Sequence, residues 1–179
     1  MAAPVVTPRT WVVGEVVTAA MMNAEVRAQF TGLVGLFCCT QVTTSSFAIP
    51  SHASNYTAVQ FSSIASSNDT SMWSGGNPTR LVAPRAGTYL VHGGISWPSG
   101  LGTNDARSEF RYNGTGTTIS TARVGTQTES SGNCQSTASG VIVFTTASHY
   151  VEWYCNQNSG ASLNVGVTLG MTCISQATS

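Results

Sequence analysis

The feature that most constrains the fold of this chain is an alternating stretch at residues 81–97, LVAPRAGTYLVHGGISW. Successive side chains of a β-strand point to opposite faces, so the alternation predicts a strand with one buried face. Pro84 and Gly87 fix where the strand begins, because Pro cannot donate a hydrogen bond to a sheet and Gly adopts conformations that other residues avoid. One face is expected to carry Tyr89, Val91, Gly93 and Ile95, and the other Leu90, His92, Gly94 and Ser96.

Further short segments with a period of two follow along the chain after Cys39. They are separated by runs of Ser, Asn, Asp, Gly and Pro, the residues that form turns. Asn113 and Gly114 give the strongest hairpin signal, within a loop that is longer than a two-residue turn. A continuous apolar run at residues 140–146 predicts a strand buried on both faces. About nine or ten short strands at regular spacing predict a mainly β fold, a two-sheet sandwich or jelly roll.

The first 37 residues have a different character. Residues 1–17 mix apolar residues with two Pro and a Gly, which is typical of an extended arm. Thr18 is a suitable N-cap for a helix that follows it. A mostly apolar stripe along that helix has the four-three spacing of a short coiled coil, and consists of Met22, Val26, Gln29, Leu33 and Leu36.

Two interpretations of this helix stay open: it packs on its own domain, or it docks to symmetry mates or a larger assembly. We favour the second, because two heptads alone are marginal in water. The expected organisation is therefore an anchoring arm and helix at residues 1–37 and a β domain at residues 38–179.

The composition excludes several classes of partner. Hydrophobic residues make up 41% of the chain and charged residues only 8%, against roughly a quarter in an average soluble domain. Seven basic residues balance seven acidic ones, so we expect neither nucleic acid nor an anionic membrane as a partner. The apolar runs are far shorter than the ~20 residues that span a bilayer, and the N-terminus lacks the apolar core of a signal peptide. Because so little charge keeps copies apart, a closed oligomer is expected.

Candidate catalytic chemistry is sparse. A glycosidase needs two carboxylates across a cleft, for which Glu109 and Glu152 are the candidates, but a strand Glu more often pairs with an Arg such as Arg111 or Arg123. The three His residues have no ligand spacing, so no metal and no cofactor are expected. We therefore predict that the protein is not an enzyme.

The five cysteines have no metal-site or disulfide-framework pattern. Cys155 and Cys173 are expected to be buried thiols on strands. One pair can oxidise after cell lysis, but the sequence does not say which, and the disulfide state of Cys134, Cys155 and Cys173 stays open.

A candidate ligand loop lies between residues 62 and 78, where Met72 and Trp73 stand among Ser, Thr and Asn. Exposed aromatic residues in such surroundings are typical of glycan recognition. The alternative is that Trp73 tucks under its own loop.

The segment TWVVGEVVTAAMMNAEVRAQF resembles an N-terminal pattern of structural proteins from phages that infect actinobacteria. This resemblance implies a virion protein, without distinguishing head from tail. The expected anchoring residues in this region are Trp11, Gly14, Glu15, Met22, Asn23, Val26, Arg27, Phe30 and Leu33.

A second resemblance spans roughly residues 40–175. The motifs RLVAPRAGTYLV at 80–91, RYNGT at 111–115 and HYVEWYCNQNSGASL at 149–163 are similar to those of the complement globular-head and tumour necrosis factor-like jelly roll, in its phage form. This resemblance implies a ten-stranded jelly roll that forms a tight homotrimer. Aromatic residues bury well at such interfaces, and the candidates for the trimer interface are Tyr89, Trp97, Tyr112, Tyr150, Trp153 and Tyr154.

Together these observations predict a trimeric virion surface protein of a phage: a head fibre, a decoration protein or a tail-associated spike. It would assemble in the bacterial host cytoplasm and attach to capsid or tail proteins through residues 1–37. Two alternatives stay open, a tail module that binds a host-surface glycan or receptor, and a small polysaccharide-degrading enzyme.

Overall fold

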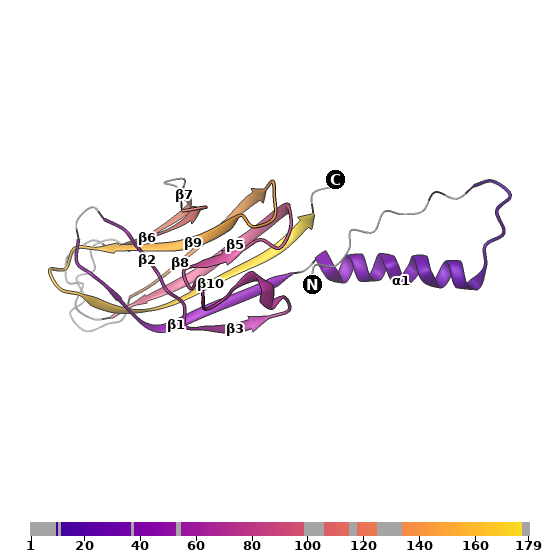
Figure 1. Ribbon diagram of the computed structural model, residues 1–179. Helices are drawn as coiled ribbons and strands as arrows, with labels where there is room; N and C mark the ends of the chain where they lie inside the picture. The colour runs from indigo at the N-terminus through magenta and orange to yellow at the C-terminus, as the bar shows by residue number, and fades with distance from the viewer. Residues whose placement is uncertain are drawn as a thin grey trace.

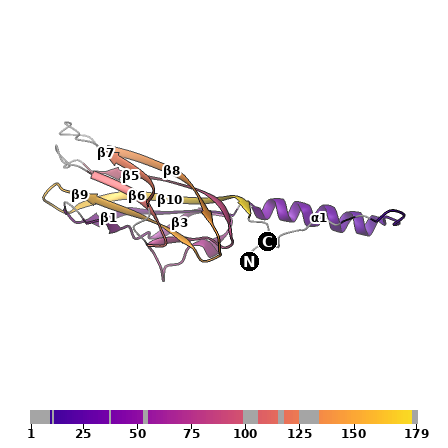
Figure 2. The ribbon, with the colours of Figure 1, turned by 90° about the horizontal axis from the view of Figure 1, so that it is seen from above.

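Two antiparallel sheets pack face to face, and a helix projects from one end of them (Figures 1 and 2). The computed structural model describes residues 10, 12–36, 38–52, 55–98, 106–114, 118–124 and 134–176, with the backbone alone for 28–36, 118–124, 134 and 176. The elements are α1 (Ala19–Leu36), β1 (Cys39–Ile49), β2 (Thr57–Ala58), β3 (Ser63–Ser67), the 3-10 helix η1 (Thr70–Met72), β4 (Arg80–Val82), β5 (Gly87–Trp97), β6 (Ala106–Tyr112), β7 (Thr118–Val124), β8 (Cys134–Phe144), β9 (Tyr150–Gln157) and β10 (Leu163–Gln176).

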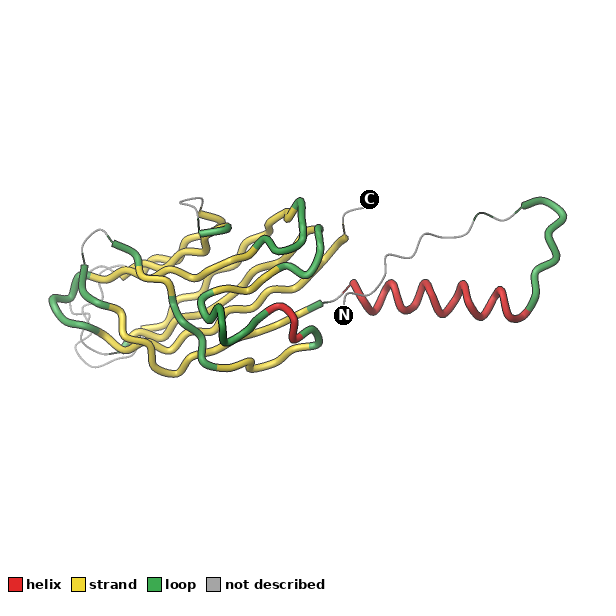
Figure 3. The backbone as a smooth tube through the Cα atoms, viewed as in Figure 1, coloured by secondary structure: helices red, strands yellow, loops and turns green. Residues whose placement is uncertain are grey.

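The strands form two layers, and the chain passes back and forth between them. The first sheet has the order β3-β1-β10-β5-β8. In the second, β9 pairs with β6, β6 pairs with β7, and the short strands β2 and β4 both pair with β9. Apart from β6 and β7, neighbouring strands in this arrangement are not consecutive in the sequence, as in a jelly roll, and Figure 3 traces the path.

Strand β5 lies inside the first sheet, between β10 and β8. Its alternation is the predicted one: Tyr89, Val91 and Ile95 are buried, whereas Leu90 is exposed. The core between the sheets also contains the fully buried aromatic residues Trp97, Phe110, Phe144 and Trp153. The expectation of a mainly β sandwich organised around residues 87–97 is confirmed.

Three of the aromatic residues predicted at a subunit interface lie in this core instead. Tyr89, Trp97 and Trp153 each have an exposed fraction of 0% within one chain, so they cannot touch another subunit. Trp153 packs edge-on to Phe110, with ring centroids 4.6 Å apart, and Tyr89 packs in the same way on Phe144 at 5.1 Å. The prediction was wrong for these three residues because they lie on the inward faces of their strands. The largest side chains fill the space between the two sheets, where they are buried within one subunit.

The predicted hairpin turn has the expected backbone. Asn113 has φ +48° and Gly114 φ +65°, the left-handed pair that a tight hairpin turn requires. Asn113 also accepts a hydrogen bond from the Tyr150 backbone N–H through Oδ1, at 2.8 Å. This contact joins the end of β6 to the start of β9; residues 115–117 lie outside the described part of the chain.

The helix α1 begins where the sequence predicts. Thr18 accepts a hydrogen bond from the Met21 backbone N–H through Oγ1 at 3.2 Å, and its carbonyl accepts one from the Met22 N–H at 3.0 Å. The helix begins at the end farthest from the sandwich, runs back toward it and ends at Leu36, three positions before β1 begins at Cys39. Among the described residues, no helix has the length and apolar character that crossing a membrane requires.

The apolar run at residues 140–146 differs from its prediction. β8 is the edge strand of the first sheet, and only its inward face is covered: Phe144 is buried, but Val141 and Val143 are 60% and 62% exposed. The run is therefore buried on one face rather than two within a single subunit. Nothing in the described part of the subunit covers the other face.

Candidate assembly surface

Charge is segregated between the two sheets. None of the strands β1, β3, β5, β8 and β10 contains an Asp, Glu, Lys or Arg, and we call their layer the uncharged sheet. The other layer, the charged sheet, carries every charged residue that lies in a described strand: Arg80, Arg107, Glu109, Arg111, Arg123 and Glu152. A sheet face that meets water normally carries some charge, so the uncharged sheet is suited to contact something other than solvent.

The outer face of the uncharged sheet has an apolar half at the end nearest α1. Leu90 pairs across the sheet with Val141, and Thr88 pairs with Val143. Ile174 on β10 is 48% exposed at the same end. These exposed side chains form an apolar patch, defined by Leu90, Val141, Val143 and Ile174.

The other half of this face is made of small and hydroxyl-bearing residues. Cross-strand neighbours there include Thr168 with Gly94, and Gly94 with Thr137. Two adjoining hollows of about 330 and 390 Å³ share these three residues. Because Gly and short side chains leave the backbone close to the surface, another backbone can approach this half of the face closely.

His92 lies at the centre of the same face. Its ring rests on Gly170 of β10, where a Cβ atom would come within 2.4 Å of Nε2. Its Nδ1 atom is buried and has no hydrogen-bond partner within the described subunit. The glycine therefore makes room for a flat ring on the surface of the sheet.

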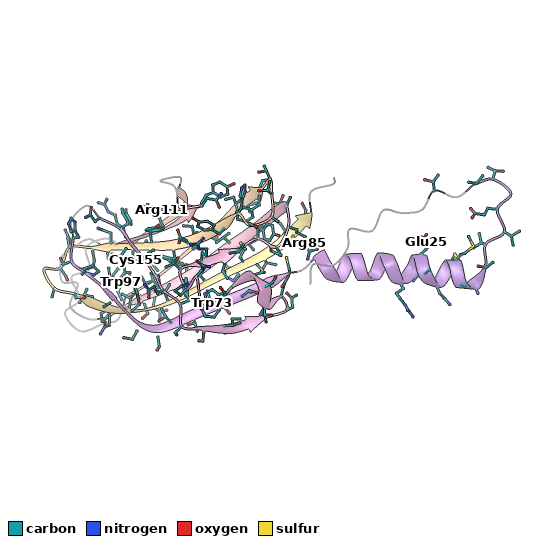
Figure 4. The ribbon with its side chains drawn as sticks, in the orientation of Figure 1. Glu25, Trp73, Arg85, Trp97, Arg111 and Cys155 are labelled. Atoms are coloured by element: carbon teal, nitrogen blue, oxygen red, sulfur yellow. The ribbon has the colours of Figure 1, made fainter. Side chains whose placement is uncertain are left out.

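The remaining predicted interface residues, Tyr112, Tyr150 and Tyr154, are half-buried and belong to the charged sheet. The Arg111 guanidinium lies 4.3 Å from the centroid of the Tyr154 ring, and that of Arg80 lies 4.4 Å from the Tyr150 ring (Figure 4 labels Arg111). Tyr112 hydrogen-bonds through Oη to His149 Nδ1 at 2.5 Å. These tyrosines already have partners in their own subunit.

The two carboxylates considered for catalysis lie on neighbouring strands of the charged sheet, and both are nearly buried. Glu109 pairs with Arg111 (Oε1 to Nε, 2.5 Å), as expected for a strand glutamate. Glu152 accepts hydrogen bonds from Thr79 Oγ1 at 2.6 Å and from Tyr154 Oη at 3.1 Å. Burial, and after it the Glu152 carboxylate, raise the pKa of Tyr154. The described residues contain no cluster of three or more His, Cys, Asp or Glu side chains that could hold a metal.

The candidate ligand loop folds back on itself. Met72 is fully buried and is not available to a ligand, which corrects the prediction for this residue. Trp73 is half-buried, and its Nε1 donates a hydrogen bond to the Pro78 carbonyl at 3.3 Å. Asp69 caps η1 by accepting from the Ser71 backbone N–H at 3.1 Å. The second interpretation of Trp73, a residue tucked under its own loop, describes this arrangement.

The predicted anchoring residues lie on α1 and the turn before it. Gly14 has φ +88°, and the Glu15 N–H donates to the Val12 carbonyl at 3.0 Å. On the helix, Met22 and Val26 are about half exposed, and Asn23 and Arg27 are exposed. Trp11 lies outside the described residues, as do the side chains of Phe30 and Leu33.

Sequence reasoning missed the apolar patch. The signal was present, since residues 39–49, 87–97, 134–144 and 163–176 contain no charged residue at all. The absence of charge from several strands is visible in the sequence, but that these strands share one sheet is visible only in the fold.

No family model matches this sequence, and no curated protein is detectably similar to it in sequence. Solved structures do resemble it. The globular domain of zebrafish complement 1qA protein has a TM-score of 0.57 at 8% identity, covering 78% of this chain and 99% of that one. Murine APRIL at pH 8.0 has a TM-score of 0.56 at 12% identity, covering 77% and 99%. The Eiger TNF of S. frugiperda has 0.52 at 10%, covering 80% and 96%. The β domain therefore has the complement/tumour necrosis factor-like jelly-roll fold.

Proposed function

We propose that this chain is a homotrimeric surface protein of a phage virion, in which the subunits meet on the outer face of the uncharged sheet and α1 attaches the trimer to the particle. It is a head fibre, decoration protein or tail-associated spike, and it is not an enzyme. The observation that carries this proposal is the segregation of charge, because it leaves one whole sheet without a charged side chain, and a charged side chain is the kind most costly to bury at an interface.

The apolar patch supports association on this face. Val141 and Val143 are each about 60% exposed in the single chain. Complete burial of a Val or Leu side chain stabilises by about 1.5–3 kcal/mol, so several such residues in each subunit provide a substantial driving force. The Gly and hydroxyl half of the face then lets neighbouring backbones approach. Trimers are also what the resemblance to the jelly-roll family implies.

The helix supports the attachment role. Met22 and Val26 are exposed on a helix that projects from the sandwich, and such a helix is marginal in water without a partner. The base of α1 adjoins the end of the uncharged sheet that carries the apolar patch, so three subunits joined there would bring three helices together. Residues 11–27 carry the pattern that resembles phage structural proteins, which supports a virion as the partner.

The alternatives have less support. A glycan-binding loop at Trp73 needs an exposed aromatic face, but this ring is half-buried and its N–H is engaged. A glycosidase needs two carboxylates that reach the sugar across a cleft, but Glu109 and Glu152 are buried, 8% and 6% exposed, and hold partners in the charged sheet. We therefore propose display and attachment rather than ligand turnover.

Deletion of residues 1–37 tests the attachment role. The remaining chain should fold into a soluble trimer that no longer joins phage particles. In the full-length chain, replacing both Met22 and Val26 by Ser should reduce incorporation, whereas Ala24→Ser, at an exposed position of the same helix, should not. Normal incorporation of the truncated chain would refute the attachment role.

A further inference from the structure

Two cysteines face each other at the junction between α1 and the sandwich. Cys39 of β1 is opposite Thr172 of β10, so the antiparallel register places Cys38 opposite Cys173. The Cys173 backbone N–H donates to the Cys38 carbonyl at 2.9 Å, as in a hydrogen-bonded pair of an antiparallel ladder. The Cα atoms of such a pair are about 5.5 Å apart, within the range of roughly 4.4–6.8 Å that a disulfide spans.

Both side chains of this pair point into the same part of the core. Cys38 is 4% exposed and Cys173 is fully buried. Tyr89, which is opposite Cys173 on β5, lies beneath them, and its Oη is 3.9 Å from Cys38 Sγ. Burial raises the pKa of the Cys173 thiol, and the neighbouring Cys38 thiol raises it further.

The other described thiols are placed differently. Cys39 points to the opposite face of the sheet, where its sulfur accepts a hydrogen bond from Thr172 Oγ1 at 3.3 Å. Cys155 is buried on β9, in the charged sheet. Cys155 and Cys173 are both free, buried thiols on strands, as predicted from the sequence. Cys38 and Cys173 are thus directly opposed across one strand pair.

We propose that Cys38 and Cys173 are a redox-active pair that closes to a disulfide when the protein meets a small-molecule disulfide. The Cys38 thiolate attacks the oxidant, forms a mixed disulfide and releases one small thiol. Cys173 then displaces the second small thiol, giving the Cys38–Cys173 bond. Two protein S–H bonds are lost and one S–S bond forms, while the oxidant is reduced to two thiols. Cys38 acts first because it is 4% exposed, whereas Cys173 is completely buried.

Formation of this disulfide breaks no strong hydrogen bond. Tyr89 Oη still donates to the Arg85 carbonyl at 3.0 Å after the Cys38 S–H is lost. The Cys173 S–H donates only a weak hydrogen bond, to the Ser175 carbonyl at 3.4 Å. The new bond ties the residue just before β1 to the last strand, so the base of α1 is held to the sandwich. It closes most of the chain into one loop, which restricts the unfolded state.

The experiment uses full-length protein, purified reduced and then equilibrated with oxidised glutathione. Peptide mapping should find a Cys38–Cys173 link, and Tm should rise by roughly 10 °C. The rise should persist in Cys155→Ser and disappear in both Cys38→Ser and Cys173→Ser. The wild-type map needs no variant to fold: a link that involves Cys39, Cys134 or Cys155 would overturn the proposal, and so would thiols at positions 38 and 173 that stay free at equilibrium.

Discussion

Gly93→Ala tests the contact between Gly93 of β5 and the Trp153 ring of β9, which packs the two sheets together. Gly93 is on the inward side of β5, and the six-membered ring of Trp153 from the opposite sheet rests on its backbone. A Cβ atom at position 93 would be 1.9 Å from Trp153 Cζ3 and 2.4 Å from the Thr168 carbonyl oxygen. Ordinary carbon contacts are about 3.5–4 Å, so the ring must move by roughly 1.5 Å or more. Trp153 is completely buried and is held by Phe110, so it has no space to move into.

The expected cost follows from these contacts. Overpacking a core typically destabilises by about 1–3 kcal/mol, and a clash with backbone as well as with a ring belongs at the upper end. Replacing Gly by Ala also lowers the conformational entropy of the unfolded chain, which stabilises the folded state by about 0.4–1 kcal/mol and offsets part of this cost. We therefore expect Gly93→Ala to lower the free energy of unfolding by about 2–3 kcal/mol, a large part of the stability of an ordinary domain.

Urea unfolding followed by circular dichroism measures this change. Gly76→Ala is a control away from both sheets, since its Cβ would meet only Ser74 Oγ, at an ordinary 3.9 Å. Gly75→Ala is a second control, in a loop where no heavy atom lies within 4 Å. Trp153→Leu should partly rescue Gly93→Ala, because the ring clash is removed and the carbonyl clash is not. Equal stability of the Gly93 and Gly76 variants would refute the proposed packing.

Two further predictions concern the charged sheet. Arg111→Ala should lower the free energy of unfolding by about 3 kcal/mol, because it leaves the nearly buried Glu109 carboxylate unpaired and removes a cation–π contact with Tyr154. Arg111→Lys should cost less. A loss below about 0.5 kcal/mol for Arg111→Ala would contradict the pairing. Stability should also fall as pH rises above about 9, because burial raises the pKa of Cys155 well above 9.0 and that of Tyr154 above 10.0, so the unfolded state releases protons that the folded state keeps. The slope is up to about 1.4 kcal/mol per pH unit for each group, and Cys155→Ala should flatten it between about pH 9 and 10; an unchanged slope would show that another group is responsible.

Local patterns predicted the elements well. The alternation around β5, the Thr18 cap and the Asn113 turn each depend on a few neighbouring residues, and each is found where the sequence places it. The sequence predicted that a strand Glu pairs with an Arg such as Arg111 or Arg123, and the structure selects Arg111 as the partner of Glu109.

The assignment of surfaces depended on information that no local pattern carries. Tyr89 and Trp153 were expected at an interface, yet they fill the core, because the side of a strand that faces the other sheet is decided by the fold. The run containing Val141 has the same sequence signature whether its second face is covered by its own chain or by another subunit. Only the folded structure, in which Val141 and Val143 are 60% and 62% exposed, shows that this subunit leaves the second face uncovered.

The solution mass of the purified full-length protein, measured by sedimentation equilibrium, tests the central claim most directly. We expect three times the subunit mass of 18.6 kDa for the natural chain and for Gln60→Asp, which adds a charge at an exposed loop position. Val141→Asp adds the same charge within the apolar patch and should yield folded monomers. A natural chain that sediments as a monomer, or a Val141→Asp variant that remains fully trimeric, would contradict assembly through the uncharged sheet.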